Sequence, residues 1–245
     1  MLTKIIFFVL SVGMLFSCKK ENMCDCVKST GNRMATYRNL SNFTCIDAND
    51  KMDIYLTQGN TYEVRVEAGK NLQSLIKTEL DGETLKVFNK NRCNWVRDYN
   101  EKINIYITAP QFNYIENNGL GTIQTTAVLT QSAVVCRITS SGGINLNVNT
   151  YKVSGSSHGN GDLYLSGTTN QFMYDYVGTN YLYLSELTIL NYAYLHSVTI
   201  GKTFFNAPEN GLMDIIIDQN GDVFYKGNPS TVHLTKNGKG NLIKQ

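Results

Sequence analysis

The repeating unit of the chain is clearest in Gly159-Asn160-Gly161-Asp162-Leu163-Tyr164-Leu165, which joins a Gly/Asn turn to a short run of alternating apolar side chains. A closely similar segment, Gln-Asn-Gly-Asp-Val-Phe-Tyr, occupies residues 219–225. Alternation with a period of two predicts a strand that buries one face. The return of the same turn predicts that this strand belongs to a repeat.

The turn recurs at steps of 19 to 21 residues through the second half of the chain. Glycine and asparagine tolerate positive φ, so we expect each recurring residue to form a tight turn. Two positions after each of them, six of seven residues are aliphatic and are expected to point inward. These marker residues are Gly121, Gly142, Gly161, Asn180, Gly201, Gly221 and Gly240.

A period near 20 residues, with one strand-turn signal per period, is typical of a solenoid. Equivalent residues of successive rungs would stack about 4.8 Å apart, and the aliphatic positions would merge into a continuous core. The sequence therefore predicts an all-β fold, a single-stranded parallel β-helix with rungs of about 20 residues. The general crossover preference predicts a right-handed coil.

The distribution of charge divides the chain. Residues 18–110 carry 26 charged side chains among 93, whereas residues 111–245 carry 15 among 135. We expect a signal peptide at 1–17, a tether at 18–35, irregular rungs at 36–110 and regular rungs at 111–245. Within the irregular part, segments starting at Val64, Leu85 and Ile103 are expected to be successive rungs, with residues 89–101 as an inserted loop.

The leader predicts export and a lipid anchor. The apolar run from Ile5 to Phe16 is too short to span a bilayer, but it has the length of a signal-peptide core. It ends in Leu15-Phe16-Ser17-Cys18, which resembles a lipobox, so Cys18 is the predicted lipidation site. The alternative is an ordinary signal peptide. We expect an outer-membrane lipoprotein on the periplasmic or cell-surface face of a Gram-negative envelope.

Export permits disulfides. Cys24, Cys26, Cys45 and Cys93 are the candidates, and two pairings stay open: Cys24–Cys45 with Cys26–Cys93, or Cys24–Cys93 with Cys26–Cys45. Cys136 alternates in phase with its apolar neighbours and is expected to be a buried free thiol. A zinc site is the competing interpretation of Cys24 and Cys26, but it needs two further ligands at suitable spacing, and the three histidines, at 158, 196 and 233, all lie far away in the sequence. Neither a metal nor a cofactor is predicted.

Composition and carboxylate spacing exclude several functions. The net charge of +2 and the absence of a basic block argue against a nucleic-acid surface. Asp162 and Asp222 share one repeat position but lie three rungs, about 14 Å, apart. Glycoside hydrolysis needs roughly 5–9.5 Å between its two carboxylates. We interpret both as turn caps and predict no enzyme activity; the alternative is a polysaccharide lyase or hydrolase.

The position three residues after each marker should point outward. In consecutive rungs it holds Tyr164, Tyr183, Phe204 and Phe224. Such a strip of exposed aromatic side chains is unusual on a soluble monomer, and it is the candidate ligand-binding surface. The structural interpretation is cross-strand stacking that only stabilises the sheet.

Several segments, in this order, resemble the head GIN domain family of putative auto-transporter adhesins over residues 36–243. The resemblance implies a right-handed parallel β-helix similar to the pectin-lyase class, a secreted or lipid-anchored envelope protein and an adhesive role, and it transfers no catalytic residues. The chain departs from the family pattern at Asn180 and around Gly201. The segments are Phe43-Thr44-Cys45-Ile46, Asp53-Ile54-Tyr55-Leu56-Thr57-Gln58-Gly59, Val64-Arg65-Val66-Glu67-Ala68, Gly159-Asn160-Gly161-Asp162-Leu163 and Gly221-Asp222-Val223-Phe224-Tyr225-Lys226-Gly227-Asn228-Pro229.

Together these features predict a lipid-anchored adhesin or binding module for a glycan or a surface protein. A structural envelope component, with the aromatic strip buried in a homo-oligomer, is the remaining alternative.

Overall fold

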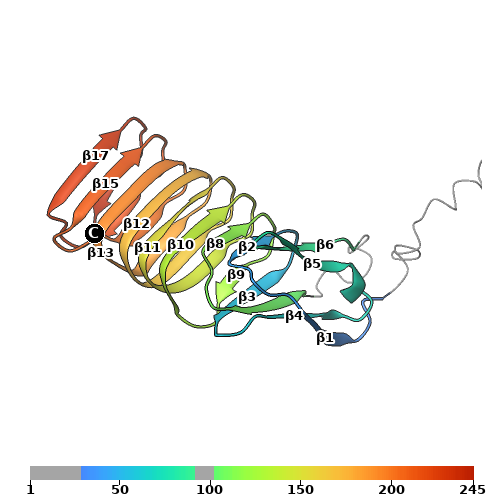
Figure 1. The fold of residues 1–245 in the computed structure, drawn as a ribbon. Coiled ribbons are helices and arrows are strands. Elements are labelled where there is room, and N and C mark those ends of the chain that lie inside the picture. Colours follow the sequence, from blue (N-terminus) through green and yellow to red (C-terminus); the bar gives the residue numbers. More distant parts are fainter. Residues whose placement is uncertain (1–28, 92–101) are drawn as a thin grey trace, which may run out of the picture.

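The computed structural model describes residues 29–91 and 102–245. Within them the chain forms an all-β solenoid of about seven turns, in which strands about 20 residues apart stack in parallel (Figure 1). The predicted fold class is confirmed. The predicted leader and lipidation site, the predicted loop beyond Asn91, and three of the four disulfide candidates lie outside the described residues.

The strand pairings divide the coil into two walls. Wall 1 runs in the order β7 (Asn104–Ala109), β3 (Asp53–Gln58), β9 (Ile123–Thr125), the first parts of β11 (Ile144–Ser157), β12 (Leu163–Gly178) and β13 (Leu182–Thr199), then β14 (Thr203–Asn206), β16 (Val223–Lys226) and β18 (Leu242–Lys244). Wall 2 runs in the order β6 (Thr84–Asn89), β2 (Cys45–Ala48), β8 (Tyr114–Asn117), β10 (Leu129–Ile138), the later parts of β11, β12 and β13, then β15 (Leu212–Ile217) and β17 (Thr231–Lys236).

The core is built from columns of equivalent residues, as the repeat predicts. On wall 1 the residues two positions after the markers pair in register and are at most 1% exposed as far as Val223. Leu242, in the last described strand, continues the column and is only partly buried. Removing these columns from water is the main force that holds the coil together. The buried column is Ile123, Ile144, Leu163, Leu182, Thr203 and Val223.

Glycine is required at the marker positions for a different reason from the one that we predicted. None of the seven markers has a positive φ. Each marker glycine instead lies so close to the preceding rung that a Cβ atom would overlap a backbone carbonyl oxygen. At Gly161 that oxygen belongs to Gly142, and at Gly221 it belongs to Gly201. The glycines are therefore required by close stacking of turns, and our positive-φ interpretation was wrong.

The N-terminal rungs also differ from the prediction. Strand β4 (Glu63–Gly69) pairs antiparallel with β7 and with β1 (Arg33–Arg38), and β5 (Ile76–Asp81) forms an antiparallel hairpin with β6. Strand β3 lies between β7 and β9, so the order of rungs is not the order of the sequence. The segments starting at Val64, Leu85 and Ile103 are thus not three successive parallel rungs, because long-range pairing overrides their spacing.

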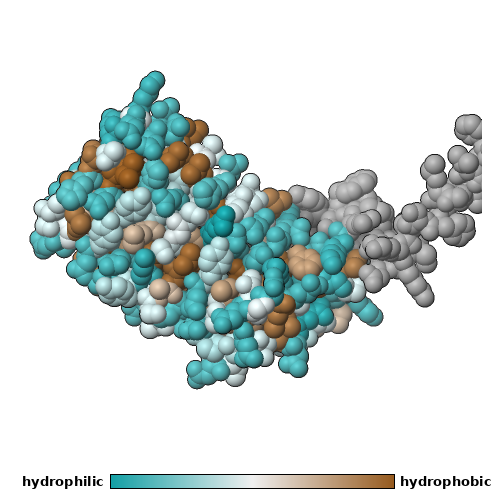
Figure 2. All heavy atoms as spheres, turned by 45° about the horizontal axis from the view of Figure 1, so that its top comes forward, coloured by the Kyte–Doolittle hydropathy of each residue, from teal (hydrophilic) through white to brown (hydrophobic). Residues whose placement is uncertain are grey.

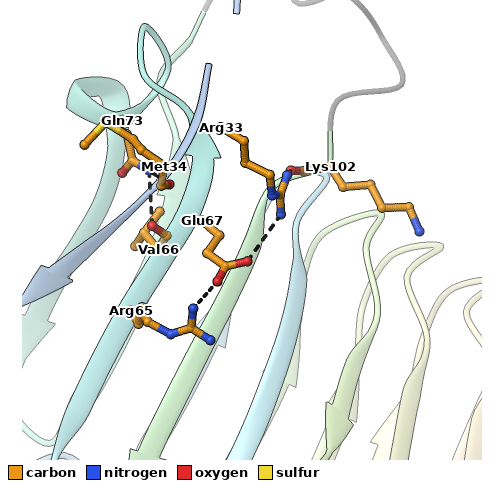
Figure 3. A network of polar contacts seen from close by, with 7 residues as sticks. All are labelled: Arg33, Met34, Arg65, Val66, Glu67, Gln73 and Lys102. Atoms are coloured by element: carbon orange, nitrogen blue, oxygen red, sulfur yellow. Dashed lines mark hydrogen bonds and ion pairs between the residues drawn. The ribbon is translucent and has the colours of Figure 1, made fainter. Parts of the chain in front are cut away.

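The first strand is fastened to the sheet by polar contacts (Figure 3). Arg33 donates to the carbonyl of Lys102 at 2.7 Å, and its guanidinium lies 3.6 Å from Glu67, which also pairs with Arg65. The buried amide of Gln73, in the short 3₁₀ helix Gln73–Leu75, donates to the carbonyls of Met34 and Val66. Strand β1 therefore begins inside the segment that we expected to be a tether.

The C-terminal rung is open. Every residue of β17 is exposed, including Val232 and Leu234, which pair with the buried Met213 and Ile215 of the previous rung. Lys236 and Lys244 end the two last strands. Charged side chains, lysine above all, discourage an edge strand from pairing with another chain.

Candidate functional site

The four outward aromatic residues form one stack on wall 1, which we call the aromatic ridge: Tyr164, Tyr183, Phe204 and Phe224. They pair strand to strand in register. Successive ring centroids lie 4.4, 6.2 and 5.1 Å apart, and adjacent ring planes differ by only 8 to 11°. Parallel in-register strands produce this arrangement, because the same position of each rung returns at nearly the same place.

The ridge is accessible, most of all at Tyr164. That side chain is 42% exposed, and the other three are half-buried. Overlapping rings cover one another's faces, and Asn145 and Ile243 are the in-register neighbours of the two end rings, so the stack is open mainly along its outward edges. Side chains packed in this way are held in place before any ligand binds, which lowers the entropy cost of binding.

The aromatic surface is larger than the sequence indicated. Tyr181 stacks on Tyr183 at 6.0 Å. Farther along the same wall, Tyr55 stacks on Tyr106 at 4.8 Å, and Arg65 lies 4.0 Å from the centroid of the Tyr106 ring. The repeat could not reveal the Tyr55–Tyr106 pair, because β3 and β7 are neighbours only through the altered order of rungs.

Hydrophobic side chains on the face shown in Figure 2 form separate patches, several of them toward the C-terminal end of the coil, with hydrophilic residues between them. This face does not carry one continuous apolar surface. Large exposed apolar residues are likewise spread over many strands and turns, from Met34 to Leu234.

The outer side of wall 2 carries a different group of side chains. Both ring nitrogens of His196 face carboxylates, Asp175 at 3.2 Å and Asp218 at 2.8 Å. Asp214 accepts a hydrogen bond from the Tyr192 hydroxyl at 2.8 Å and lies 2.7 Å from a ring nitrogen of His233. Burial, followed by the bond to Asp214, raises the pKa of Tyr192 to about 12. The sequence did not predict the bridge from His196 to Asp175 and Asp218.

This network predicts a pH effect on stability. Hydrogen bonds from His196 and Asn237 lower the pKa of Asp218. A carboxyl whose pKa is lowered by folding stabilises the fold above its unfolded pKa, near 4, and loses that contribution as pH falls through the folded value. Asp218→Asn should therefore flatten the fall in melting temperature below about pH 4. If the melting temperatures of the variant and of the original chain fell equally steeply below about pH 4, the prediction would be wrong.

The remaining candidates are placed as follows. The carboxylates of Asp162 and Asp222 accept the backbone N–H groups of Tyr181 and Asn241 in the next rung, each at 2.8 Å, which is the capping role that the sequence predicts. Among the residues that the structure describes, no group of three or more His, Cys, Asp or Glu side chains could hold a metal ion.

Cys136 is fully buried and free, as predicted, and burial raises the pKa of its thiol to about 12. Cys45, which both predicted disulfide pairings include, is partly exposed and has no cysteine partner among the described residues. The disulfide candidates Cys24, Cys26 and Cys93 and the lipidation candidate Cys18 lie outside the described residues, so pairing and lipidation stay predictions. No helix in the described ranges is long and apolar enough to cross a membrane.

Comparison with known proteins gives a consistent result. A model of the family described as "Putative auto-transporter adhesin, head GIN domain" matches residues 42–229. No curated protein sequence matches the chain.

Several solved structures share the fold. A "putative adhesin" from Bacteroides fragilis is 24% identical with a TM-score of 0.78, and the match covers 87% of this chain and 97% of that one. A "putative adhesin" from Parabacteroides distasonis is 16% identical with a TM-score of 0.65, covering 88% and 98%. A "putative lipid binding protein" from the same organism is 16% identical with a TM-score of 0.60, covering 89% and 98%.

Proposed function

Because the chain belongs to the head GIN domain family of putative auto-transporter adhesins, we propose that it is a non-enzymatic binding protein of the cell envelope that holds a glycan on its aromatic ridge. The observation that carries this proposal is the stack of four rings on consecutive rungs, open to solvent on wall 1.

Chemistry favours a glycan as the ligand. One side of a pyranose ring presents C–H groups, which pack on aromatic surfaces, while its hydroxyls bond to polar neighbours. The ridge has such neighbours: Asn145 pairs with Tyr164 in the preceding rung, and Ser166 and Asn206 follow Tyr164 and Phe204 on the same outward face. A chain of sugars can extend over several rungs, and each rung repeats the same kind of contact.

The arrangement of carboxylates supports binding without turnover. Asp162 and Asp222 are committed to backbone N–H groups, and their rungs are three steps apart along the coil. The cluster of acids on wall 2 is likewise bonded to histidine and tyrosine side chains. These bonds hold the acids in capping and bridging roles.

The proposed location rests on the leader. An apolar run that ends in Ser17-Cys18 supports attachment to the outer membrane through acyl chains on Cys18. The described coil would then stand away from the membrane with the ridge available to a glycan. Metabolic labelling of cells with a fatty-acid probe should label the original chain, and Cys18→Ala should remove the label. Equal labelling of both would contradict the anchor.

The proposal is tested by binding of the full chain to a glycan array. The original chain should bind at least one glycan, and Tyr164→Ala/Tyr183→Ala should weaken that binding about 100-fold, as expected for two central aromatic contacts. Tyr151→Ala is the matched control, since Tyr151 is 60% exposed but lies away from the ridge, and it should change affinity less than twofold.

The double variant loses three ring contacts of Tyr183, with Tyr164, Tyr181 and Phe204, each worth about 1 kcal/mol, so its melting temperature is measured first to confirm that it is folded in the binding assay. A folded original chain that binds no glycan, or a double variant that binds as well as the original, would overturn the proposal.

A further inference from the structure

A groove of about 410 Å³ opens at the corner of the coil beyond β14 and β16. Its volume lies within the range of sites that hold small ligands. Ile189 and Leu190 give it an apolar part. Thr188, Asn206, Glu209 and Lys226 supply polar groups. It therefore combines apolar contact with hydrogen-bonding groups and one cation.

The groove continues directly from the aromatic ridge. Asn206 and Lys226 pair with each other in register, as Phe204 and Phe224 do. Each lies two residues beyond its aromatic partner on the same strand, hence on the same outward face and about 7 Å farther along. A ligand that contacts the Phe204–Phe224 end of the ridge can therefore reach into the groove.

Some charged groups near the Phe204–Phe224 end of the ridge already have hydrogen-bond partners, and others do not. Glu209 accepts the backbone N–H of Asn228 at 3.1 Å, and Asp222 accepts two N–H groups of Asn241. The ammonium of Lys202 lies 5.8 Å from the Phe224 centroid. Across residues 29–91 and 102–245, the ammonium groups of Lys202 and Lys226 form no hydrogen bond or ion pair, and both side chains are exposed.

We infer that this end of the ridge, together with the groove, selects an acidic saccharide, one whose sugar rings carry a carboxylate. This inference rests on the proposed function and names the class of glycan. The sugar ring contacts Phe204 and Phe224, and its carboxylate pairs with Lys226, with Lys202 on the other side of the ridge. Hydroxyls bond to Thr188 and to the free oxygen of Glu209. Asn206 contributes its amide oxygen, because its amide nitrogen already donates to the carbonyl of Ser185 at 2.5 Å.

A neutral glycan would leave both ammonium groups without a partner. A charge-assisted hydrogen bond is stronger than a neutral one and depends on salt when it is exposed. Selection for an acid should therefore appear as a difference between a carboxylated polymer and its neutral counterpart, and that difference should shrink as salt is raised.

The test measures binding of the full chain to polygalacturonate, alginate and hyaluronan, each beside its carboxyl-reduced neutral form. The original chain should bind at least one acidic polymer about tenfold more tightly than the reduced form. Lys226→Gln should weaken binding of the acidic polymer about tenfold and leave the affinity for the reduced form unchanged. Lys226→Arg should restore most of the loss, and Lys239→Gln, at an exposed lysine in another turn, should have no effect.

The possible outcomes distinguish failure of the acidic-saccharide inference from failure of the ridge as the binding site. Equal binding of acidic and reduced polymers, with Lys226→Gln and Lys202→Gln unchanged and Tyr164→Ala/Tyr183→Ala impaired, overturns the acidic class but keeps the ridge. Binding that survives Tyr164→Ala/Tyr183→Ala overturns the proposed site as well. Failure to bind any of the three acidic polymers, while a neutral glycan binds, also overturns the inference.

Discussion

Replacing Gly161 with alanine should lower the free energy of unfolding by about 3 kcal/mol. A Cβ atom at this position would overlap the carbonyl oxygen of Gly142 and press on the Ile138 side chain. The obstacle is backbone of the preceding rung, so no side-chain rotation can relieve it, and the two turns must move apart. For a domain of this size, the melting temperature should fall by roughly 6–12 °C.

Gly143 provides the matched control. It has the same residue type and lies directly after a marker, yet its Cβ would approach the Asp162 carbonyl only to 3.1 Å. Gly143→Ala should therefore cost less than about 1 kcal/mol, because a shift of a few tenths of an ångström is sufficient. Thermal unfolding of both variants decides the question. Equal effects would mean that the marker glycines serve something other than close stacking.

Replacing Phe172 with alanine should cost about 4 kcal/mol, the largest effect that we expect from a single core substitution. Phe172 is 1% exposed in β12 and lies between Val153 and Ala193 of the adjacent rungs, with its ring 5.9 Å from that of Tyr174. Its small neighbours cannot expand to fill the space, so much of the ring volume would remain as a cavity.

Leu190→Ala is the control for this cavity. Leu190 lies on β13 but is 48% exposed, so truncation removes little buried surface and should cost less than about 1 kcal/mol. Denaturant unfolding measured for both variants gives the comparison. If Phe172→Ala were no more costly than Leu190→Ala, the interior of the coil would not be the close-packed core described above.

The regular half of the coil was predictable because each rung is one period of the sequence. The inward column from Ile123 to Val223 and the outward column from Tyr164 to Phe224 follow from alternation after a marker, and the pairing registers place them together. The constant period of about 20 residues was therefore sufficient to predict both the fold and the four residues of the ridge.

The N-terminal half could not be derived in this way. Strand β3 inserts between β7 and β9, and β4 reverses direction against β7, so the contacts that define these rungs are long-range. For the same reason the sequence does not predict the Tyr55–Tyr106 pair. The marker glycines show a second limit, because glycine is favoured both by positive φ and by close backbone approach, and a sequence does not distinguish the two causes.

The groove beside the ridge depends on how the turns at residues 207–211 and 227–230 leave β14 and β16. Those turns interrupt strands that are continuous in β12 and β13, and the repeat pattern carries no signal for the space that results. The bridge between His196 and its two aspartates was missed likewise, since its partners come from three different rungs.

The proposed function requires that the aromatic ridge is the surface that holds a glycan. Hydroxyl-radical footprinting of the full chain, with and without bound acidic polysaccharide, tests it without altering the protein. We expect the ligand to protect the four ridge rings, Tyr164, Tyr183, Phe204 and Phe224, from oxidation and to leave the exposed Tyr37 and Tyr151 unprotected. Protection elsewhere, with the four ridge rings oxidised as fast as in the free protein, would contradict it.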